Sequence, residues 1–423
     1  MKKIDTIIIS GGKGSRFRTI QSLPKILTKF NKKTIFDIIK DNLQKYGLNK
    51  IHLLCGKNKE RIIESIKKKK NLFFYDEEKL LGTAGCLNKL DSNNLSEDII
   101  IIFGDLLFNI DFLKFFKFHK KKNSDITIFS HPSDHIYDSD VLKVEKDNKV
   151  ENIFYKPHKK KIISNNLTIA GIFIIKKKLL KEIPKNKKVD FSKYLLKKLL
   201  KKNFFIASYN SREYCKDFGT PDRYKIVKKD YKNKIHLLRS YEKKLPAIFL
   251  DRDGVINKDM GPNQYSNPFN FLNDAIKSLI KLRKSKYLIF LITNQPSVAK
   301  GFITHQQLTK SFLKYEIFLS SKGFYFDKIY FCPHHPHKGF KGENIKFKIN
   351  CICRKPKPGL LYLANREFNL DLKKSFFIGD SSNDYFAALK AKVKPIIINK
   401  NFKHSKKCVY KRNILEAVNY IIN

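Results

Sequence analysis

The 423-residue sequence has no tryptophan, two methionines and few acidic residues for its length. Asp and Glu total 39 against 87 Lys and Arg, which gives a formal net charge of +48. It also lacks any run of about 18 apolar residues, and this argues against a membrane span. Because 42% of the residues are hydrophobic, the chain can still bury real cores and is not a disordered protein.

Arginine is the scarce basic residue. The chain has 11 Arg against 76 Lys, and the lysines are spread along its whole length. Arg is the side chain that bidentate recognition of phosphates and base edges favours, so we expect no nucleic-acid partner. The charge should instead steer small anionic, phosphorylated substrates toward the protein. A nucleic-acid-binding protein is the alternative that the net charge leaves open.

A secretory signal is also missing. Residues 1–14 are basic and then apolar, but the apolar stretch is short, contains Asp5 and ends in a glycine loop. We therefore expect a cytoplasmic protein with no membrane partner, whose first strand begins here. Of the seven cysteines, three lie within residues 332–353, which favours a metal site over disulfides in such a chain.

Apolar runs of strand length alternate with helical stretches along the whole chain, which predicts an α/β protein. Strands are expected at 4–10, 50–55, 71–75, 98–103, 125–130, 168–175 and 204–209, with helices at 34–47 and 190–203. Residues 232–244 are charged and predict a linker. A second alternation has strands at 246–250, 286–293, 327–332, 375–380 and 394–399. We expect two Rossmann-like domains, 1–231 and 245–423, each with a mainly parallel sheet.

Polar residues follow three of the strands expected in the second half. Asp251 and Asp253 follow the first, Thr293 ends the second, and Asp380 ends the third, with Asp384 shortly after. Active sites of open parallel sheets gather at the carboxyl ends of the strands. One Asp after a strand is more often a turn or a helix cap, but the ordered set, with RKPKPG between its members, is far more specific.

This set resembles the haloacid-dehalogenase (HAD) superfamily of phosphatases. The resemblance implies that Asp251 is the nucleophile and Asp253 the general acid and base, so that one difficult hydrolysis becomes two easier steps. It implies Mg²⁺ held by Asp251, the backbone carbonyl of Asp253 and Asp380. Thr293 and Lys355 would bind the phosphoryl oxygens. The residues expected to bind the rest of the substrate are Asp259, Asn294, Gln295 and Arg354.

Two Cys-containing pairs separated by sixteen residues lie just before the RKPKPG segment. The four candidate ligands are Cys332, His334, Cys351 and Cys353. Three thiolates and one imidazole make a closed tetrahedral zinc site of the structural type. Because His335 and His337 lie beside His334, the choice of histidine stays open.

The zinc loop and the CRKPKPG segment together resemble the D-glycero-D-manno-heptose 1,7-bisphosphate 7-phosphatases. Histidinol-phosphate phosphatases share a related loop and are the nearest alternative. The segment ITNQPSVAKG matches the heptose family except at Pro296 and Ser297, and Ser381 stands where a basic residue is common.

In the first half, a glycine-rich turn follows the first strand, where backbone N–H groups can approach phosphates. Such a turn alone could belong to a Rossmann-like domain without catalysis. With LGTAG at 81–85, FGD ending at Asp105, and KDFGTPDRY, the order resembles the sugar-1-phosphate nucleotidyltransferases, which have a GT-A-like fold. The residues that this resemblance assigns to the nucleoside triphosphate are Gly11, Gly12, Gly14, Arg16, Lys25 and Gly82.

The same resemblance implies Mg²⁺ held by Asp105 and Asp217, and a sugar phosphate contacted by Lys156. The reaction needs no covalent intermediate, so positioning and charge neutralisation do most of the catalysis. Tyr155 replaces the usual Glu of the sugar site, and Ser15 replaces a common Thr.

Together the two halves predict a bifunctional enzyme of activated-heptose synthesis. The phosphatase would remove the 7-phosphate, and the transferase would couple the heptose 1-phosphate to a nucleotide, GTP being preferred because no HxGH signature of the ADP route is found. One alternative is a fusion that acts on another sugar phosphate. The alternative from another class is a basic nucleic-acid-binding protein with a polynucleotide phosphatase domain.

Overall fold

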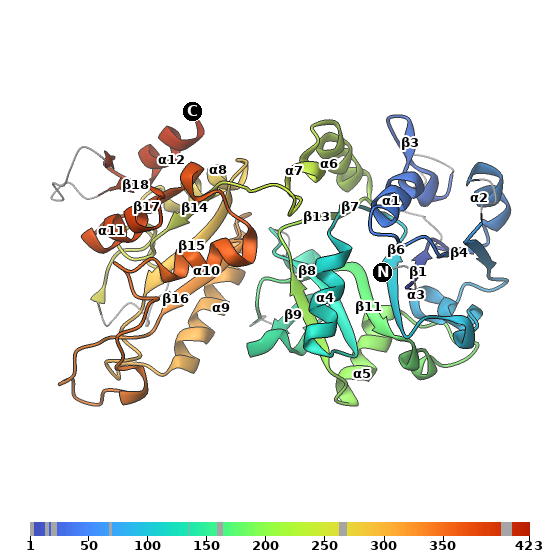
Figure 1. Ribbon diagram of the computed structural model, residues 1–423, viewed down its shortest axis with the longest axis horizontal. Coiled ribbons are helices and arrows are strands. Elements are labelled where there is room, and N and C mark those ends of the chain that lie inside the picture. The colour runs from blue at the N-terminus through green and yellow to red at the C-terminus, as the bar shows by residue number, and fades with distance from the viewer. Residues whose placement is uncertain are drawn as a thin grey trace. The chain divides into compact units, whose positions relative to one another are not determined.

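The computed structural model describes residues 4–12, 17, 23–66, 70–134, 136–158, 164–261, 269–398 and 408–423. The chain divides into two compact units (Figure 1): Met1–His131, Asp140–Tyr155 and Leu167–Tyr241 form the first, and Pro132–Ser139, Lys156–Asn166 and Glu242–Asn423 form the second. The division after Tyr241 falls inside the stretch predicted to link the domains. Two loops from the first half of the sequence, Pro132–Ser139 and Lys156–Asn166, belong to the second unit.

The first unit contains a twisted sheet whose parallel part carries the glycine-rich turn. Its parallel strands are β1 (Asp5–Ile9), β4 (Ile51–Gly56), β5 (Leu72–Asp76) and β6 (Asp98–Phe103). The spatial order β6-β1-β4-β5 places β1 between β6 and β4. The carboxyl ends of these strands therefore lie at one edge of the sheet, where Gly104, after β6, donates to the carbonyl of Ile9 at 2.8 Å.

The rest of this sheet is antiparallel or mixed, which differs from the mainly parallel sheet expected. Its strands are β8 (Ile126–His131), β9 (Val141–Val144), β10 (Val150–Phe154), β11 (Thr168–Lys176) and β12 (Ile206–Asn210). β11 runs antiparallel to β6 and β8, whereas β12 runs parallel to β8. Apolar runs buried on both faces look alike in either direction, so their pattern could not predict the direction of β11.

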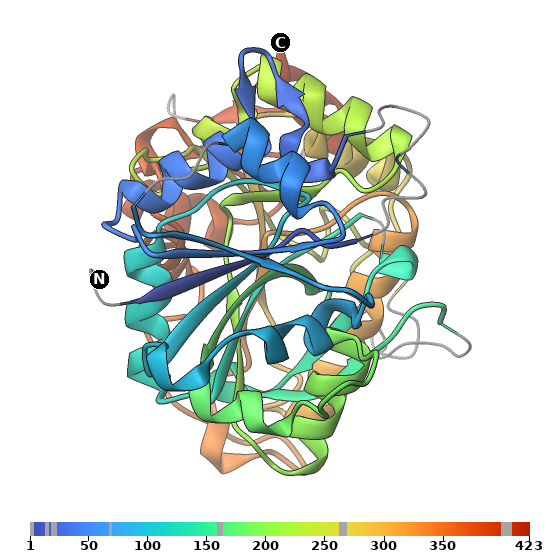
Figure 2. The same ribbon diagram turned by 90° about the vertical axis from the view of Figure 1, so that its right-hand side faces the viewer.

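Helices cover both faces of the first sheet, as Figure 2 shows. One core packs α1 (Ile35–Gln44), α2 (Lys59–Ile66), α4 (Phe112–Lys122) and α6 (Pro221–Lys232) against the sheet. The other core includes α3 (Gly82–Gly85), the π-helical turn Phe191–Leu196 and α5 (Lys197–Lys201). α1 begins at a capping box in which Thr34 and Asp37 bond reciprocally, so the polar cap sets where the helix begins.

A short two-stranded sheet joins two distant parts of the first unit. β7 (Leu106–Asn109) pairs antiparallel with β13 (Tyr214–Asp217), so that Asp217 is opposite Leu106. Because Asp105 directly precedes β7 and Asp217 ends β13, this pairing brings the two carboxylates together. Within the predicted linker, α7 (Ile235–Leu238) follows α6 and packs on β7 and β13.

The second unit has a parallel sheet in the order β16-β15-β14-β17-β18-β19. Its strands are β14 (Ala247–Leu250), β15 (Leu288–Asn294), β16 (Lys328–Cys332), β17 (Phe376–Gly379), β18 (Lys394–Ile397) and β19 (Val409–Tyr410). All its strand pairs are parallel, and β14 is central, between β15 and β17. The expected parallel α/β fold of this half is confirmed.

Two helical layers cover this sheet. α8 (Ala275–Arg283), α9 (His305–Ser321) and α12 (Ile414–Ile422) pack on one face, and α10 (Gly359–Phe368) and α11 (Ser382–Lys390) on the other. Alternate residues of β14 enter the two cores. Ile248 and Leu250 pack in the core under α8, α9 and α12, and Ala247 and Phe249 pack in the core under α10 and α11. In the part of the chain that the structure describes, no helix is long and apolar enough to span a bilayer.

Candidate active sites

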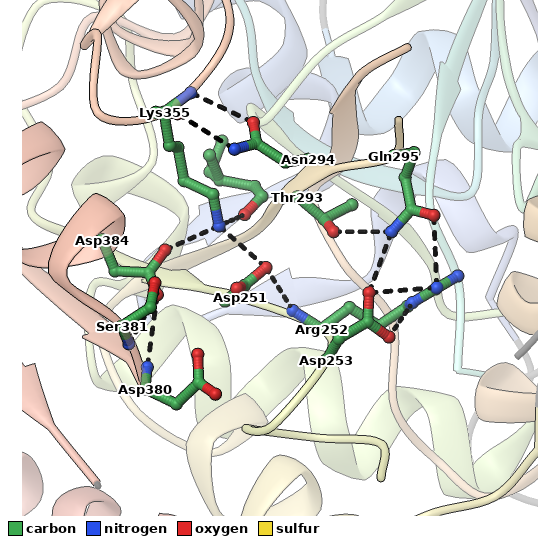
Figure 3. A network of polar contacts seen from close by, with 11 residues as sticks. Asp251, Arg252, Asp253, Thr293, Asn294, Gln295, Lys355, Asp380, Ser381 and Asp384 are labelled. Atoms are coloured by element: carbon green, nitrogen blue, oxygen red, sulfur yellow. Dashed lines mark hydrogen bonds and ion pairs between the residues drawn. The ribbon is translucent and has the colours of Figure 1, made fainter. Parts of the chain in front are cut away.

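The residues predicted for phosphate chemistry in the second unit converge at the carboxyl ends of three neighbouring strands (Figure 3). Asp251 follows β14, Thr293 lies near the end of β15, and Asp380 follows β17. Gly254, with φ +78°, lies close to Asp380, because a Cβ on it would overlap the Asp380 carboxylate. The positive φ and the absent side chain let the loop after β14 turn across the site.

Lys355 lies at the centre of this site. Its Nζ is 2.9 Å from Asp251 Oδ1 and 2.6 Å from Asp384 Oδ1, and it donates to the carbonyl of Ile292 at 3.1 Å. The Asn294 side chain holds the lysine backbone, since Nδ2 donates to the Lys355 carbonyl (3.1 Å) and Oδ1 accepts from its N–H (3.0 Å). The lysine is 3% exposed, so its charge depends on these partners.

Asp384 belongs to this site, although no role was predicted for it. Its Oδ2 accepts from the N–H (3.1 Å) and hydroxyl (2.7 Å) of Ser381 and from the N–H of Asp380 (3.2 Å). It therefore caps α11 with one oxygen and pairs with Lys355 through the other. Its position four residues after Asp380 was the available signal, but Asp after a strand is also a common helix cap.

Asp253 is held apart from the Lys355 cluster by its own partners. Arg252 binds it through Nε (2.8 Å) and Nη2 (3.1 Å), and Gln295 Nε2 donates to its Oδ2 at 3.0 Å. The same Gln295 nitrogen donates to Thr293 Oγ1 at 2.8 Å. Asp251 and Asp253 thus have different environments, one beside a buried ammonium group and the other beside a guanidinium group and an amide.

Three carboxylates of this site can approach one ion. Oxygens of Asp251, Asp380 and Asp384 lie within 4.8 Å of one another. Burial and the neighbouring carboxylates raise the pKa of Asp251 to about 8 and that of Asp380 to about 7, although Lys355 opposes both shifts. One lysine does not offset the charge of three carboxylates, so the site fits a divalent cation with oxygen ligands, such as Mg²⁺.

Two predicted substrate residues lie outside this cluster. Asp259 is exposed, and its Oδ1 accepts from the backbone N–H of Gly261 at 2.9 Å. Arg354 donates from Nη1 to the carbonyl of His334 at 3.1 Å. Because Lys355 is the next residue, this bond connects the Lys355 cluster to the Cys-rich loop.

The Cys-rich loop forms a compact group of four possible metal ligands. The sulfurs of Cys332, Cys351 and Cys353 lie 3.1–3.5 Å apart, and His334 Nδ1 is 3.3 Å from the Cys353 sulfur. All three thiols are free. His335 Nδ1 is 3.4 Å from the carbonyl of His337, so the structure places His334 alone among the three histidines in the group. Three sulfurs and one imidazole nitrogen fit zinc with no coordination position left for water.

In the first unit, Lys25, Asp105 and Asp217 gather around Gly219. Lys25 Nζ is 2.9 Å from Asp105 Oδ2, and Arg223 Nη1 donates to both oxygens of Asp217 at 2.8 and 2.9 Å. A Cβ on Gly219 would lie 3.3–3.4 Å from Lys25 Nζ and from an oxygen of each Asp, so the glycine leaves space between the charged groups. The two carboxylates therefore fit a shared divalent cation at an open strand end.

Three of the predicted nucleotide-binding glycines line one cavity of about 190 Å³. Gly11 and Gly12 follow β1, and Gly82 begins α3 with φ +80°. A Cβ on Gly82 would lie 2.6 Å from the carbonyl oxygen of Val189, so only glycine fits at this close approach. The cavity also contains Glu77, for which no role was predicted.

Among the described residues, Lys25 and Lys156 of the first-half prediction do not line that cavity. Gly14 and Arg16 lie outside the described residues. Lys156 groups with the second unit, where its Nζ donates to the carbonyl of Asp138 at 2.8 Å. Its role toward a sugar phosphate stays a prediction. Tyr155, at the usual position of a Glu, packs against the second core of the first unit.

Comparison with family models defines the class of the protein. The model described as nucleotidyl transferase matches residues 5–234, and the model described as polynucleotide kinase 3 phosphatase matches residues 247–408. The chain is thus an enzyme with a nucleotidyltransferase domain followed by a HAD-type phosphatase domain. It belongs to the nucleotidyl transferase family through its first half and to the D-glycero-β-D-manno-heptose-1,7-bisphosphate 7-phosphatase family through its second.

The second assignment rests on curated relatives. The heptose bisphosphate phosphatase of Photorhabdus laumondii is 40% identical over 149 residues, which are 35% of this chain and 77% of that protein. That of Pasteurella multocida is 39% identical over 157 residues, 37% of this chain and 83% of that protein. The fusion predicted from the sequence is confirmed.

Solved structures resemble each half. HddC from Yersinia pseudotuberculosis, complexed with GMP-PN, is 23% identical with a TM-score of 0.46, covering 54% of this chain and 99% of that one. The D,D-heptose 1,7-bisphosphate phosphatase from B. bronchiseptica, complexed with magnesium and phosphate, is 25% identical with a TM-score of 0.36, covering 42% and 98%.

Proposed function

We propose that the chain converts D-glycero-D-manno-heptose 1,7-bisphosphate to a nucleotide-activated heptose in two reactions. The second unit removes the 7-phosphate, and the first transfers a nucleotidyl group, GMP from GTP, to the heptose 1-phosphate. The observation that carries this proposal is the pairing of the two domains in one chain. A phosphatase that spares the 1-phosphate makes the kind of substrate that a sugar-1-phosphate nucleotidyltransferase uses.

In the phosphatase, the Asp251 carboxylate attacks the phosphorus and the bond to the sugar oxygen breaks, which gives a phosphoaspartyl enzyme. Asp253 donates the proton that the leaving sugar oxygen takes, and it then accepts one from the water that hydrolyses the phosphoaspartate. Arg252 and Gln295 fix Asp253 for this task. A Mg²⁺ held by Asp251, Asp380 and the carbonyl of Asp253 would neutralise charge on the phosphoryl group.

Lys355 supports this chemistry through its buried positive charge. Its ammonium group lies 2.9 Å from Asp251 and is fixed by Asp384 and by the Ile292 carbonyl. A positive charge fixed in a buried site can stabilise the phosphoryl oxygens without reorganising during the reaction. Thr293, whose hydroxyl accepts a hydrogen bond from Gln295, would supply a second group to bind the phosphoryl oxygens.

In the transferase, the sugar-phosphate oxygen attacks the α-phosphorus of the nucleotide and pyrophosphate leaves. Asp105 and Asp217 would hold the Mg²⁺ that neutralises the phosphates, and Lys25 lies beside Asp105, where it can bind the phosphates.

The experiment that tests both reactions incubates the protein with heptose 1,7-bisphosphate and each nucleoside triphosphate in turn. We expect phosphate to be released with or without a nucleotide, and pyrophosphate to be released only when GTP is present. Failure to release phosphate from the bisphosphate would contradict the proposal.

A second candidate has support of its own. The phosphatase half matches the model described as polynucleotide kinase 3 phosphatase, and the net charge is +48. A polynucleotide phosphatase should release phosphate from a 3′-phosphorylated oligonucleotide, and its binding should weaken steeply with salt. Faster turnover of this oligonucleotide than of the heptose bisphosphate would favour the second candidate.

A further inference from the structure

Two loops of the nucleotidyltransferase half of the sequence fold with the phosphatase half. Pro132–Ser139 lies between β8 and β9, and Lys156–Asn166 lies between β10 and β11. Both belong to the second unit, which also contains α9. The residues of these loops that the structure describes are 132–134, 136–139, 156–158 and 164–166. The second unit is therefore built from both halves of the sequence.

The helix α9 holds the two loops through side chains on one of its faces. Ser320 Oγ donates to the carbonyl of Ser133 at 2.7 Å, and Ser320 is 1% exposed. One turn earlier, the Glu316 carboxylate accepts a hydrogen bond from the backbone N–H of Asn166. The turn Ile136–Asp138 also packs against α9. Because residues four apart lie on the same side of a helix, a single face of α9 contacts both loops.

The two loops are also bonded to each other. The Asn166 side chain donates from Nδ2 to the Ser133 carbonyl (2.8 Å), and its Oδ1 accepts from the Ser133 N–H (3.2 Å). At the start of the second loop, Lys156 Nζ donates to the carbonyl of Asp138 in the first, at 2.8 Å. A shift of one loop would break bonds to the other, so the contacts with α9 fix the position of both.

The helix itself is firmly held within the second unit. Leu308, Phe312 and Leu319 are buried in the core that α9 shares with α8 and α12. Tyr315, which directly precedes Glu316, donates from its hydroxyl to Asn257 Oδ1 at 2.7 Å. Closely packed side chains of this kind leave a helix little freedom to move. The two loops therefore take the position that α9 gives them.

Lys156 is a cation of this assembly that an anionic substrate can reach. Its side chain is 38% exposed, and that of Asp138, whose Oδ1 is 3.4 Å from Nζ, is 67% exposed. An ion pair so open to water contributes little stability, so a phosphate group can displace the carboxylate. Because a lysine is a compact charge on a flexible stem, the position of its backbone decides where that charge is available.

We propose that Ser320 and Glu316 of α9 are positioning residues for nucleotidyl transfer, because they fix the loop from which Lys156 binds the phosphate of the sugar 1-phosphate. The inference rests on the proposed nucleotidyl transfer and on the predicted role of Lys156. It gives a helix of the phosphatase half a part in the reaction of the other half.

The test measures kcat and KM of the full chain for pyrophosphate release, with heptose 1-phosphate and the nucleoside triphosphate varied in turn. Ser320→Ala removes one neutral hydrogen bond, and the Ser133 carbonyl keeps its bond from Asn166. The KM for heptose 1-phosphate should rise about 3- to 10-fold, the range for one such bond. The KM for the nucleotide, kcat, and phosphate release from the bisphosphate should stay within about twofold.

Glu316→Ala removes a hydrogen bond to a charged group, so the same KM should rise about 10- to 100-fold. Glu316→Gln keeps an acceptor oxygen and should recover most of this loss. The control is Ser321→Ala, because Ser321 is the next residue after Ser320, is exposed, and donates within its own helix to the Phe318 carbonyl at 2.6 Å. It should keep wild-type values, and thermal unfolding shows which variants are folded.

A double-mutant cycle separates positioning from a general loss of structure. Lys156→Ala should raise the KM for heptose 1-phosphate at least as much as Ser320→Ala does. Adding Ser320→Ala to Lys156→Ala should raise it no further, because a residue that acts through Lys156 then has nothing left to position.

The outcomes distinguish this inference from the proposed function. No pyrophosphate from the wild-type protein with any nucleoside triphosphate would contradict the nucleotidyl transfer itself. If the wild type is active, a wild-type KM in folded Ser320→Ala or in Lys156→Ala would overturn the role of α9 and keep the transferase. An equal rise of KM on adding Ser320→Ala to the wild type and to Lys156→Ala would overturn it too. Ser320→Ala decides the matter even if Glu316→Ala does not fold.

Discussion

The acidic residues of the two proposed sites are held in contrasting ways. In the second unit, Asp251 is 8% exposed and its ion pair with Lys355 is buried. In the first, the side chains of Asp105 and Lys25 are 28% and 22% exposed, and that of Asp217 is 40% exposed. Ion pairs in contact with water contribute little stability and rearrange easily, whereas buried pairs are fixed.

The contrast follows the chemistry proposed for each site. A carboxylate nucleophile must keep one position and a tuned environment, which Lys355 and the packed strand ends supply. In-line nucleotidyl transfer uses no protein nucleophile, so its acidic residues need only become ordered when nucleotide and metal bind. We therefore expect the phosphatase site to change little when its substrate binds and the transferase site to become ordered only with nucleotide and metal.

The largest effect is expected at Asp251. Asp251→Asn keeps the shape but removes the nucleophile and a metal ligand, so phosphate release should fall at least about a thousandfold. Pyrophosphate release from heptose 1-phosphate and GTP should stay within about twofold, because sites that lie in separate units and share no residues act independently. Steady-state assays of both products check this. Near-normal phosphate release by Asp251→Asn would contradict the assignment of Asp251 as the nucleophile.

Asp105→Asn should do the reverse. Pyrophosphate release should fall by about a hundredfold, since a charged metal ligand becomes neutral, while phosphate release is unchanged. Mixing this variant with Asp251→Asn should restore conversion of the bisphosphate to the nucleotide sugar. Chromatography of the products measures this conversion. Loss of both activities in either folded single variant would mean that one composite site replaces the two.

The metal centre should affect stability more than chemistry. The purified protein should contain about one zinc, and Cys351→Ser should lower its content and reduce the unfolding temperature of the phosphatase domain by roughly 5 °C or more. The matched control is Cys408→Ser, because Cys408 lies outside the ligand group. Atomic emission and calorimetry are the measurements, and a reduced wild-type protein free of zinc would contradict this prediction.

The smallest effect concerns pH. Without a bound cation, the raised pKa values of Asp251 (about 8) and Asp380 (about 7) mean that the folded state holds protons that the unfolded state has released. Stability of the metal-free protein should therefore fall as pH rises from about 4 to about 8. Mg²⁺ should raise the unfolding temperature by roughly 2–4 °C more at about pH 8 than at about pH 5.

Asp380→Asn tests whether the acidic cluster causes this pH dependence of stability. It removes one of the three carboxylates, so both the pH dependence and the gain from Mg²⁺ should shrink. Thermal unfolding in a chelating buffer, with and without Mg²⁺, gives both values. A gain from Mg²⁺ that is equal at the two pH values in the wild-type protein would show that these carboxylates are not its source.

Much of the second unit was predictable from local pattern. Five of the six strands of its parallel sheet are the predicted apolar runs, and the two-residue β19 is the one that was not predicted. Because parallel strand ends meet at one edge, Asp251, Thr293 and Asp380 could be grouped from the sequence. The Cys pairs were predictable for the same reason, since few other arrangements explain three cysteines in one loop. Asp384 was not predicted, because an Asp that only caps a helix and an Asp that also belongs to an active site have the same sequence context.

The sequence alone determined the two α/β domains, their order and the chemical class of each site, because these depend on periodicity and on residue types at strand ends. Only the tertiary structure decided the antiparallel direction of β11, the choice of His334 over His335, and the pairing of Lys355 with Asp384. It also decided the burial of Glu77 in the glycine-lined cavity. The physical reason is that direction, burial and the partner of a charge depend on contacts between segments far apart in the sequence, which no local pattern records.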